Sequence, residues 1–221
     1  MSITRRLRGG LYVDGFNLYH AINDIGKPYL KWLSLRRLGN RLMKPFDADV
    51  EEIAFCTAFF PGDFGKQKRH DAYVAALRAE SVRVIMGHTT KEDVDCRACG
   101  NVWKQPREKA TDINVALSLF EAATNDRIDI AFLITADTDQ VATLKFMGQL
   151  YPEKPVVILT PPGRPTHAHL QSLAFKSVKI SETDLDLSIL PAMITPLVGR
   201  LVTRPEPYTP PPGWMHPDER P

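Results

Sequence analysis

Four aspartates stand where the chain is expected to pass from a strand into a helix, and their carboxylates could do chemistry. They lie in the segments LYVDGFNLYH, EKATDINVAL and IAFLITADTDQ, as Asp14, Asp112, Asp137 and Asp139. In an open α/β sheet, side chains at the carboxyl ends of strands converge on one crevice. Carboxylates gathered there repel one another, and a bound cation is the usual reason for a protein to tolerate them. The pattern therefore predicts a divalent-metal site, for which phosphodiester hydrolysis is the first reaction to consider.

Each aspartate also fits a purely structural interpretation. An aspartate before a helix commonly caps it, so Asp112 and Asp139 could each cap the helix that follows. Asp14 and the glycine after it could form an ordinary turn. The combination favours a functional site, because Asp137 and Asp139 can present their carboxylates to one point from a tight turn. A single capping position explains only one of those two residues.

Polar side chains near the aspartates are candidates for holding a substrate. Asn17 follows the first aspartate by three residues and can orient a metal-bound water or a phosphate oxygen. Thr135 and Thr138 carry hydroxyls in the same turn as the acidic pair and suit either task. Lys109 can contact a substrate phosphate, although a solvated lysine is the structural alternative. We therefore expect Asn17, Thr138 and Lys109 to bind substrate.

Hydrophobic periodicity predicts strands that alternate with helices. The expected strands cover residues 10–13, 52–60, 82–86, 130–135, 156–159 and 177–180. The expected helices cover residues 30–43, 67–79, 112–124, 141–150 and 167–173. Such alternation is typical of parallel βαβ units with helices on both faces of the sheet. The sequence therefore predicts an α/β fold with a mainly parallel sheet.

The expected domain covers residues 9–190 and is followed by a proline-rich tail at 191–221. Seven of the 18 prolines lie beyond Thr203, which excludes an interior helix or central strand there. We expect an extended, solvated tail, although Tyr208 or Trp214 could dock onto a protein partner. A hydrophilic insert at about 89–107 interrupts the domain.

Two cysteines in this insert, Cys96 and Cys99, have the C-x-x-C-G form of a zinc knuckle. His88, eight residues upstream, could be a third ligand, but a structural zinc normally needs four. The alternative is a turn with two reduced thiols. The sequence therefore leaves both a Zn²⁺ site and a metal-free turn open.

Composition and charge exclude several classes of protein. The chain has 221 residues, a net charge of only +2 and three cysteines, which fits a reducing cytoplasm better than a disulfide framework. It has no apolar run of about eighteen residues, so we expect no membrane span. Asp14 interrupts the first apolar stretch, so we expect no secretory signal. Local basic clusters permit a nucleic-acid substrate without requiring one.

Three strings of the sequence resemble the motifs of NYN domains, the PIN-like nuclease group that includes the LabA-like bacterial proteins. They are VDGFNLYH, EKATDINVALSLFEAA and AFLITADTDQV, in the order that the family has them, and the resemblance covers roughly residues 11–180. It implies a Rossmann-like three-layer α/β/α sandwich. It also implies an acidic cluster that binds Mg²⁺ or Mn²⁺ and cleaves RNA.

Each of the four aspartates is similar to an acidic position in the motifs of this family. Asp14 is similar to the aspartate that ends the first strand, and Asn17 to the asparagine after it. Asp112 is similar to the aspartate that opens the central helix. Asp137 and Asp139 are similar to the acidic pair after the fourth strand. The resemblance thus implies catalytic and metal-binding roles for all four aspartates.

One departure from the family puts catalysis in question. Many relatives have further acidic residues in the central helix, where this chain has Ser118 and Ala122. If those carboxylates hold a second ion, this protein uses one ion or is less active. A non-catalytic RNA-binding or regulatory module with the same fold is therefore the alternative to a nuclease.

We expect a metal-dependent ribonuclease that hydrolyses single-stranded RNA, with Phe16, Tyr19 or Phe64 available to stack bases. A nucleotide-cofactor enzyme is disfavoured because neither G-x-G-x-x-G nor GxxxxGK[ST] occurs. A Toprim-like domain also has D-x-D after a strand, but it has glutamate where this chain has Asp14. The sequence leaves open whether the chain forms a homo-oligomer.

Overall fold

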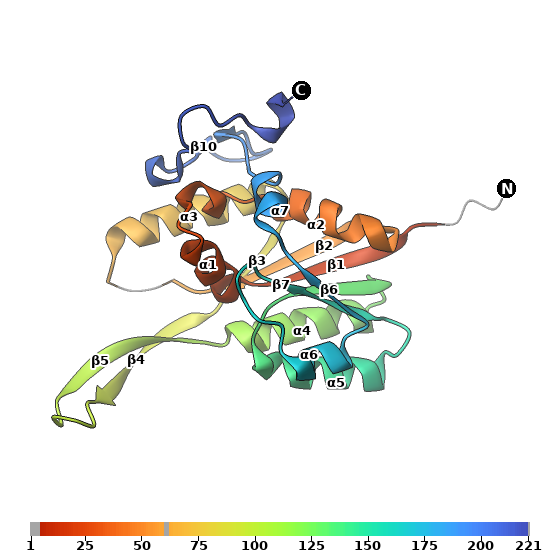
Figure 1. Cartoon of the computed structure of the whole chain (residues 1–221), viewed down its shortest axis with the longest axis horizontal. Coiled ribbons are helices and arrows are strands. Elements are labelled where there is room, and N and C mark those ends of the chain that lie inside the picture. Colours follow the sequence, from red (N-terminus) through yellow and green to blue (C-terminus); the bar gives the residue numbers. More distant parts are fainter. Residues whose placement is uncertain (1–4, 60–61, 221) are drawn as a thin grey trace.

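The centre of the protein is a six-stranded sheet in which every neighbouring pair of strands is parallel. The computed structural model describes residues 5–59 and 62–220. Across the sheet the strand order is β3-β2-β1-β6-β7-β8 (Figure 1). These strands are β1 (Leu7–Asp14), β2 (Ala48–Thr57), β3 (Arg83–Met86), β6 (Ile130–Ile134), β7 (Val156–Thr160) and β8 (Lys176–Lys179). The predicted α/β class is confirmed.

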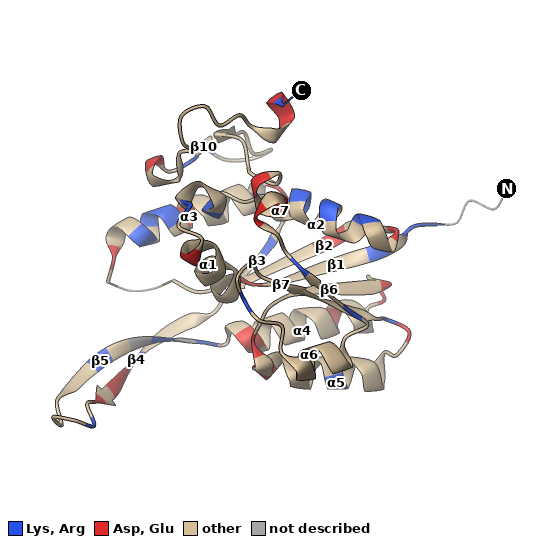
Figure 2. Cartoon of the chain, viewed as in Figure 1, with Lys and Arg blue, Asp and Glu red and all other residues tan. Residues whose placement is uncertain are grey.

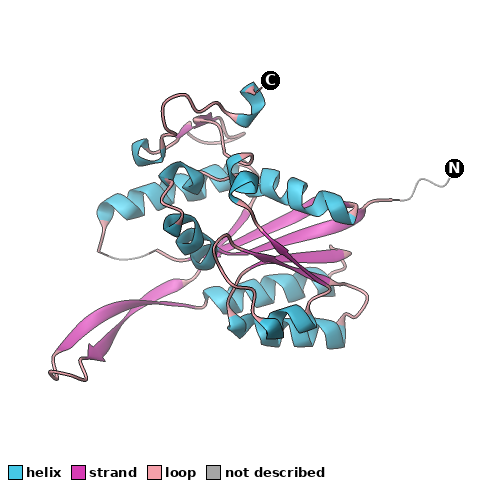
Figure 3. Cartoon of the chain, viewed as in Figure 1, coloured by secondary structure: helices cyan, strands magenta, loops and turns pink. Residues whose placement is uncertain are grey.

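Helices cover both faces of this sheet, which makes three layers (Figure 3). One face carries α1 (Gly15–Asp24), α2 (Leu35–Met43), α3 (Phe64–Ala79) and α7 (Glu182–Asp186). The other carries α4 (Thr111–Thr124), α5 (Val141–Leu150) and α6 (Ala168–Leu173). This is the expected Rossmann-like sandwich.

The apolar strands supply a core to each face. In β1, Leu11 and Val13 belong to the core under α1, α2 and α3, whereas Tyr12 belongs to the core under α4 and α5. In β6, Phe132 belongs to the first of these cores and Leu133 to the second. Successive side chains of a strand point to opposite faces. An apolar strand without polar alternation therefore fits the middle of a covered sheet, as the sequence predicts for this segment.

The strand order reverses between β1 and β6. From β1 the chain moves outward through β2 to β3, and it then returns to the other side of β1 as β6. In open α/β sheets, ligands bind outside the carboxyl ends of the strands at such a switch point. The end of β1 and the turn after β6 are therefore where a site is expected.

The polar insert forms an antiparallel hairpin of β4 (His88–Asp95) and β5 (Val102–Lys109), which projects from the sheet (Figure 1). Its ends lie within two residues of the expected insert. His88 pairs with Lys109 at the base of the hairpin, and Asp95 pairs with Val102 near the tip. The sequence did not predict these strands, because the insert lacks the alternation of apolar residues that marks a half-buried strand.

The C-terminal segment packs onto the domain, which corrects the expectation of a solvated tail. It contains β9 (Met193–Ile194), β10 (Val202–Thr203) and the 3-10 helices η4 (Glu206–Tyr208) and η5 (Pro217–Glu219). Tyr208 is 8% exposed and joins the core under α1–α3. Asp186 accepts hydrogen bonds from Tyr29, from Trp214 at 2.7 Å and from Arg220 at 2.6 Å. Proline disfavours long helices and central strands but does not prevent docking through aromatic and charged side chains.

Other expected elements differ at their ends. The expected helix at 30–43 divides into the 3-10 helix η1 (Pro28–Lys31) and α2, because Ser34 caps α2 by accepting a hydrogen bond from the backbone of Arg37. The 3-10 helix η2 (Lys44–Phe46) follows α2. Strand β2 ends at Thr57, and Phe60, the expected end, lies outside the described residues. Within the described residues, no helix has the length and apolar composition that a membrane span requires.

Candidate metal centre

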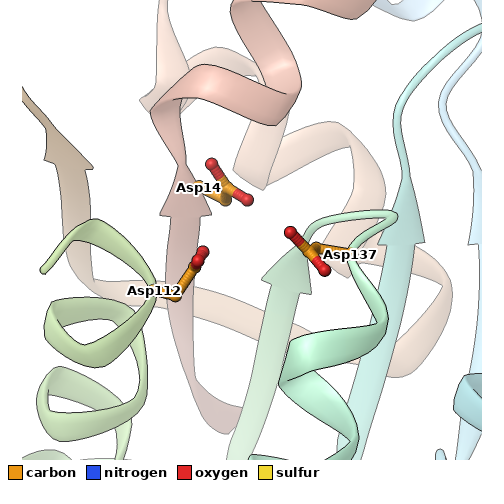
Figure 4. Close-up of side chains that lie close together, drawn as sticks. All are labelled: Asp14, Asp112 and Asp137. Carbon is orange, nitrogen blue, oxygen red and sulfur yellow. The ribbon is translucent and has the colours of Figure 1, made fainter. Parts of the chain in front are cut away.

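Three of the four predicted aspartates converge at the switch point. Asp14 at the end of β1, Asp112 in the first turn of α4 and Asp137 after β6 point toward one another (Figure 4). Each offers a carboxylate oxygen, and these oxygens lie within 4.8 Å of one another. We call these residues the aspartate triad. They are separated by up to 123 positions in the sequence, so the fold alone brings them together.

Asp14 is held by groups on both of its oxygens. Its Oδ1 accepts a hydrogen bond of 3.0 Å from the backbone N–H of Asn17, which makes Asp14 the N-cap of α1. Its Oδ2 accepts a longer hydrogen bond of 3.4 Å from the hydroxyl of Thr135. The next residue must be Gly15, because a Cβ there would lie 2.6 Å from the carbonyl oxygen of Cys56 in β2. Capping and convergence with other carboxylates therefore coexist in this aspartate.

Asp137 is fixed by the turn between β6 and α5. Its Oδ1 accepts a hydrogen bond of 2.9 Å from the backbone of Asp139 and thereby caps the 3-10 helix η3 (Thr138–Gln140). Its own N–H donates to the hydroxyl of Thr135 at 3.0 Å. The same hydroxyl donates to Asp14, so Thr135 links the two aspartates. Asn17 adds a second link, because its Oδ1 accepts the N–H of Ala136 at 3.2 Å.

Asp112 is not a helix cap, which corrects the structural alternative considered from the sequence. It is the second residue of α4, and the cap position is Ala110, which has a φ of 73° and makes no side-chain capping bond. Gln140 ties this turn to the turn of Asp137, because its Nε2 donates to the Asp112 carbonyl oxygen at 3.2 Å. Thr143 in turn donates to Oε1 of Gln140 at 2.8 Å.

Gln140 was not predicted as a site residue. Its side chain is 1% exposed, and sequence reasoning stopped at the acidic pair just before it. The sequence did contain a signal for Gln140: it is a polar residue at the start of a helix that otherwise packs against the sheet. Buried amides need partners, so Gln140 marks a contact between two loops.

The electrostatic environment of the triad disfavours three ionised carboxylates. Burial raises the pKa of Asp14 from 3.8 to about 6, with Asp112 and Asp137 adding to the rise and hydrogen bonds from Asn17 opposing it. At 4.8 Å and an effective dielectric constant of about 20, two unit charges repel by about 3 kcal/mol. The hydrogen bonds that Asp14 and Asp137 accept come from neutral donors. A cation would offset this repulsion, because it interacts favourably with every carboxylate at once.

The donor set of the triad suits a hard divalent cation. Its ligand atoms are carboxylate oxygens, which Mg²⁺ and Mn²⁺ prefer over sulfur or imidazole. Mg²⁺ is usually bound through one or two carboxylates and keeps several waters. The triad therefore fits the expected ion and leaves positions for water and substrate.

Besides Asn17, three predicted residues lie outside this triad. Asp139 is exposed and is not among the aspartates whose oxygens converge, so its backbone rather than its carboxylate serves the site. Thr138 is exposed in the same turn. Lys109 lies at the base of the hairpin, where its Nζ pairs with Glu92 at 2.7 Å. The expectation of four converging aspartates is thus corrected to three.

The proposed zinc ligands are not gathered at one place. Cys96 and Cys99 lie at the hairpin tip, whereas His88 begins β4 at its base, roughly 25 Å away at the rise of a β-strand. Among the described residues, no group of three metal-binding side chains includes either cysteine. A hydrogen bond from Cys99 and backbone N–H groups lower the pKa of the Cys96 thiol. The turn thus has two thiols, and the structure does not bring His88 to them.

The two positions at which the sequence departs from the NYN pattern face the protein interior. Ser118 is 3% exposed, and its hydroxyl donates to the carbonyl oxygen of Asn114 at 2.6 Å. Ala122 is fully buried in the core under α4 and α5. A carboxylate at Ala122 would therefore be buried in an apolar core in this chain, which is costly without a partner.

Fold and site together define the class: a Rossmann-like α/β protein with a carboxylate triad at its topological switch point. No protein-family model matches the chain. It is 24% identical over 227 residues to 6-hydroxy-3-succinoylpyridine 3-monooxygenase HspA of Pseudomonas putida (strain DSM 28022 / S16), with 85% of this chain and 72% of that protein covered. The crystal structure of VPA0982, a protein of unknown function from Vibrio parahaemolyticus RIMD 2210633, superposes with a TM-score of 0.56 at 19% identity. That match covers 86% of this chain and 100% of the other, and it supports the fold alone.

Proposed function

We propose that the protein is a metal-dependent ribonuclease that hydrolyses phosphodiester bonds of single-stranded RNA at the aspartate triad. The observation that carries the proposal is the convergence of Asp14, Asp112 and Asp137 within 4.8 Å at the switch point. The resemblance of the surrounding sequence to NYN domains supports RNA as the substrate. The triad would hold Mg²⁺ or Mn²⁺.

The reaction divides between the ion and the chain. A bound divalent ion supplies Lewis-acid stabilisation of the phosphoryl charge and a more acidic water. The triad carboxylates position that ion and accept hydrogen bonds from water. Thr135 and Asn17 hold Asp14 and the turn of Asp137 in fixed positions, so the triad is preorganised. Water adds to phosphorus and gives up one proton to solvent, the P–O bond to the leaving oxygen breaks, and that oxygen takes up a proton from solvent.

A single-stranded substrate fits the charge around the triad. A phosphate and a triad of aspartates repel each other unless a cation lies between them. A flexible strand can bring one phosphate to the triad while its neighbours contact basic side chains elsewhere. Lys66 and Arg69 on α3 are candidates for such contacts, and Figure 2 shows the positive charge along this helix.

A non-catalytic RNA-binding module remains the first alternative, because Ser118 and Ala122 replace acids found in many relatives. A second candidate is an oxygenase for a small aromatic compound. It is favoured by the likeness to a protein whose name gives a monooxygenase of a substituted pyridine. Oxygen consumption with a reductant and such a pyridine, but without RNA, would support that candidate.

The decisive experiment is cleavage of a mixed-sequence single-stranded RNA with Mn²⁺, Mg²⁺ or EDTA. We expect cleavage with either ion, none in EDTA, and none by Asp137→Asn in protein whose circular dichroism spectrum is unchanged. Asp139→Asn is the matched variant, because it makes the same change two residues away and outside the triad. It should retain metal-dependent cleavage. Equal loss of cleavage in Asp137→Asn and Asp139→Asn would contradict the assignment of the site to the aspartate triad alone. RNA binding without cleavage by the wild type would favour the non-catalytic RNA-binding module.

A further inference from the structure

A cavity of about 420 Å³ lies between α1 and α3. Its lining includes Gly15 and Thr57, at the carboxyl ends of β1 and β2, and Tyr208 of the C-terminal segment. Gly15 follows Asp14 directly, and consecutive Cα atoms are about 3.8 Å apart. The cavity and the triad therefore share one edge of the sheet. Its volume lies within the range of small-ligand sites.

Aromatic rings form much of the lining of this cavity. Phe16 and Tyr19 come from α1, Tyr73 comes from α3, and Tyr208 comes from η4. Tyr19 is 37% exposed, whereas Tyr208 is 8% exposed. Aromatic faces bind planar rings by stacking, and this works for any base. The lining therefore suits a flat, largely apolar group.

The charges around the cavity favour an anion beside that flat group. Lys31, Lys66 and Arg69 line it together with a single acidic residue, Asp63. Nζ of Lys66 lies 3.7 Å from Asp63, and Nζ of Lys31 lies 4.7 Å from the ring centre of Tyr19. Three cations against one carboxylate leave a net positive charge. A phosphate attached to a planar ring combines both features.

Two further side chains can read the edge of a ring. Gln67 contributes an amide, and His70 contributes an imidazole whose Nε2 lies 3.2 Å from the hydroxyl of Thr57. Burial lowers the pKa of His70, so its ring is neutral at pH 7. Neutral donors and acceptors of this kind recognise the exposed edges of unpaired bases.

We propose that this cavity binds the base of the nucleotide next to the scissile phosphate, while Lys66 and Arg69 contact a phosphate of the same strand. The inference rests on the proposed function, because it takes RNA to be the molecule held at the triad. The cavity holds the strand, and the triad cuts the adjoining phosphodiester. Cleavage accordingly depends on stacking of the base on one side of the scissile phosphate against the aromatic rings of the cavity.

The test measures binding apart from cleavage. Calorimetric titrations in EDTA use the full chain with the four ribonucleoside 5′-monophosphates, with adenosine, with ribose 5-phosphate and with nicotinate. We expect at least one monophosphate to bind about tenfold more tightly than adenosine or ribose 5-phosphate. Tyr19→Leu should weaken it about tenfold through lost stacking, and Lys66→Gln severalfold through a lost phosphate contact. Phe146→Leu on α5 and Lys68→Gln on α3 are matched controls that should bind as the wild type does.

The outcomes separate this inference from the proposed function. Monophosphate binding by both the wild type and Asp137→Asn, together with no cleavage of RNA by the wild type, would support the cavity and refute the nuclease. RNA cleavage that is unchanged in Tyr19→Leu and Lys66→Gln, with no monophosphate binding, would refute the cavity alone. Binding of nicotinate but of no nucleotide would also overturn the inference and point to a small aromatic carboxylate. Equal loss of binding in the matched controls would assign the effect to general charge or folding and overturn it too.

Discussion

Replacement of Asp14 by asparagine should stabilise the metal-free protein at neutral pH. Asp14 is 2% exposed and its pKa is raised from 3.8 to about 6, so ionising it in the folded protein is unfavourable. A shift of about 2.2 pH units corresponds to about 3 kcal/mol. Because the pKa of Asp14 is higher in the folded state, the protonated carboxyl contributes this free energy to stability. The contribution is fully present below about pH 4 and is lost as the pH rises through 6. Asparagine is neutral throughout and keeps a carbonyl to cap α1.

Urea denaturation in EDTA at several pH values measures this effect. At pH 8 we expect the free energy of unfolding of Asp14→Asn to exceed that of the wild type by about 1–3 kcal/mol, and at pH 4 the two should agree. Mn²⁺ at 1,000 times its Kd should reverse the order, because it stabilises the wild type by about 4.1 kcal/mol. A variant less stable than the wild type at pH 8 in EDTA, or a wild type whose stability is flat from pH 5 to 8, would refute the reasoning.

Four further predictions follow from other contacts. Asp129→Asn should lower the free energy of unfolding by about 1–2 kcal/mol at pH 7, a value reduced for the 31% exposure of the side chain. Arg8 of β1 binds both carboxylate oxygens of Asp129 and holds its pKa at about 2. In urea titrations at several pH values, the difference in free energy of unfolding between Asp129→Asn and the wild type should therefore vanish as the pH falls from 4 through 2. Gln140→Leu should cost about 1–3 kcal/mol and weaken Mn²⁺ binding in calorimetry, because it separates the turns of the triad; unchanged binding would contradict its positioning role. Asp186→Asn should cost about 1–3 kcal/mol and expose the C-terminal segment to limited proteolysis, since this carboxylate accepts hydrogen bonds from Trp214 and Arg220 of that segment; a segment that resists proteolysis would argue against docking. Cys96→Ser with Cys99→Ser should leave the melting temperature within about 1 °C in EDTA, because the hairpin tip lies away from both cores; a large fall would indicate structure that these contacts omit.

The position of the triad could be predicted because it follows from general rules of α/β folds. Asp14 and Asp137 follow apolar strands, and parallel strands end at one edge of the sheet. Asp112 opens the helix whose apolar stripe packs against that sheet. The strand order places β6 beside β1 and so brings the two aspartates together, and the sequence did not predict that order.

The contacts that fix the triad could not be predicted. Thr135 and Asn17 join residues more than 100 positions apart, and no local pattern specifies such a pair. Asp139 was expected in the cluster because it is two residues from Asp137, but it lies within the 3-10 helix that Asp137 caps, and its carboxylate is not among those that converge. The dihedral angles of a turn, rather than its composition, decide which carboxylate faces the site.

Composition misled most at the C-terminal segment. Its prolines exclude an interior helix or a central strand, and this was taken to mean a solvated chain. Tyr208 and Trp214 nevertheless pack onto the domain, and Asp186 accepts a hydrogen bond from the indole N–H of Trp214. A docking surface for an irregular segment depends on shape and on buried hydrogen bonds between distant residues, which periodicity does not report.

The most direct test of the account couples metal binding to RNA cleavage in one titration. Purified wild type and Asp112→Asn are titrated with Mn²⁺, and bound ion and the rate of cleavage of a single-stranded RNA are measured in parallel. The account predicts that both rise together in the wild type and that both are lost in the variant, whose fold is retained. Cleavage by Asp112→Asn at the wild-type rate, or Mn²⁺ bound by the wild type without any cleavage, would contradict it.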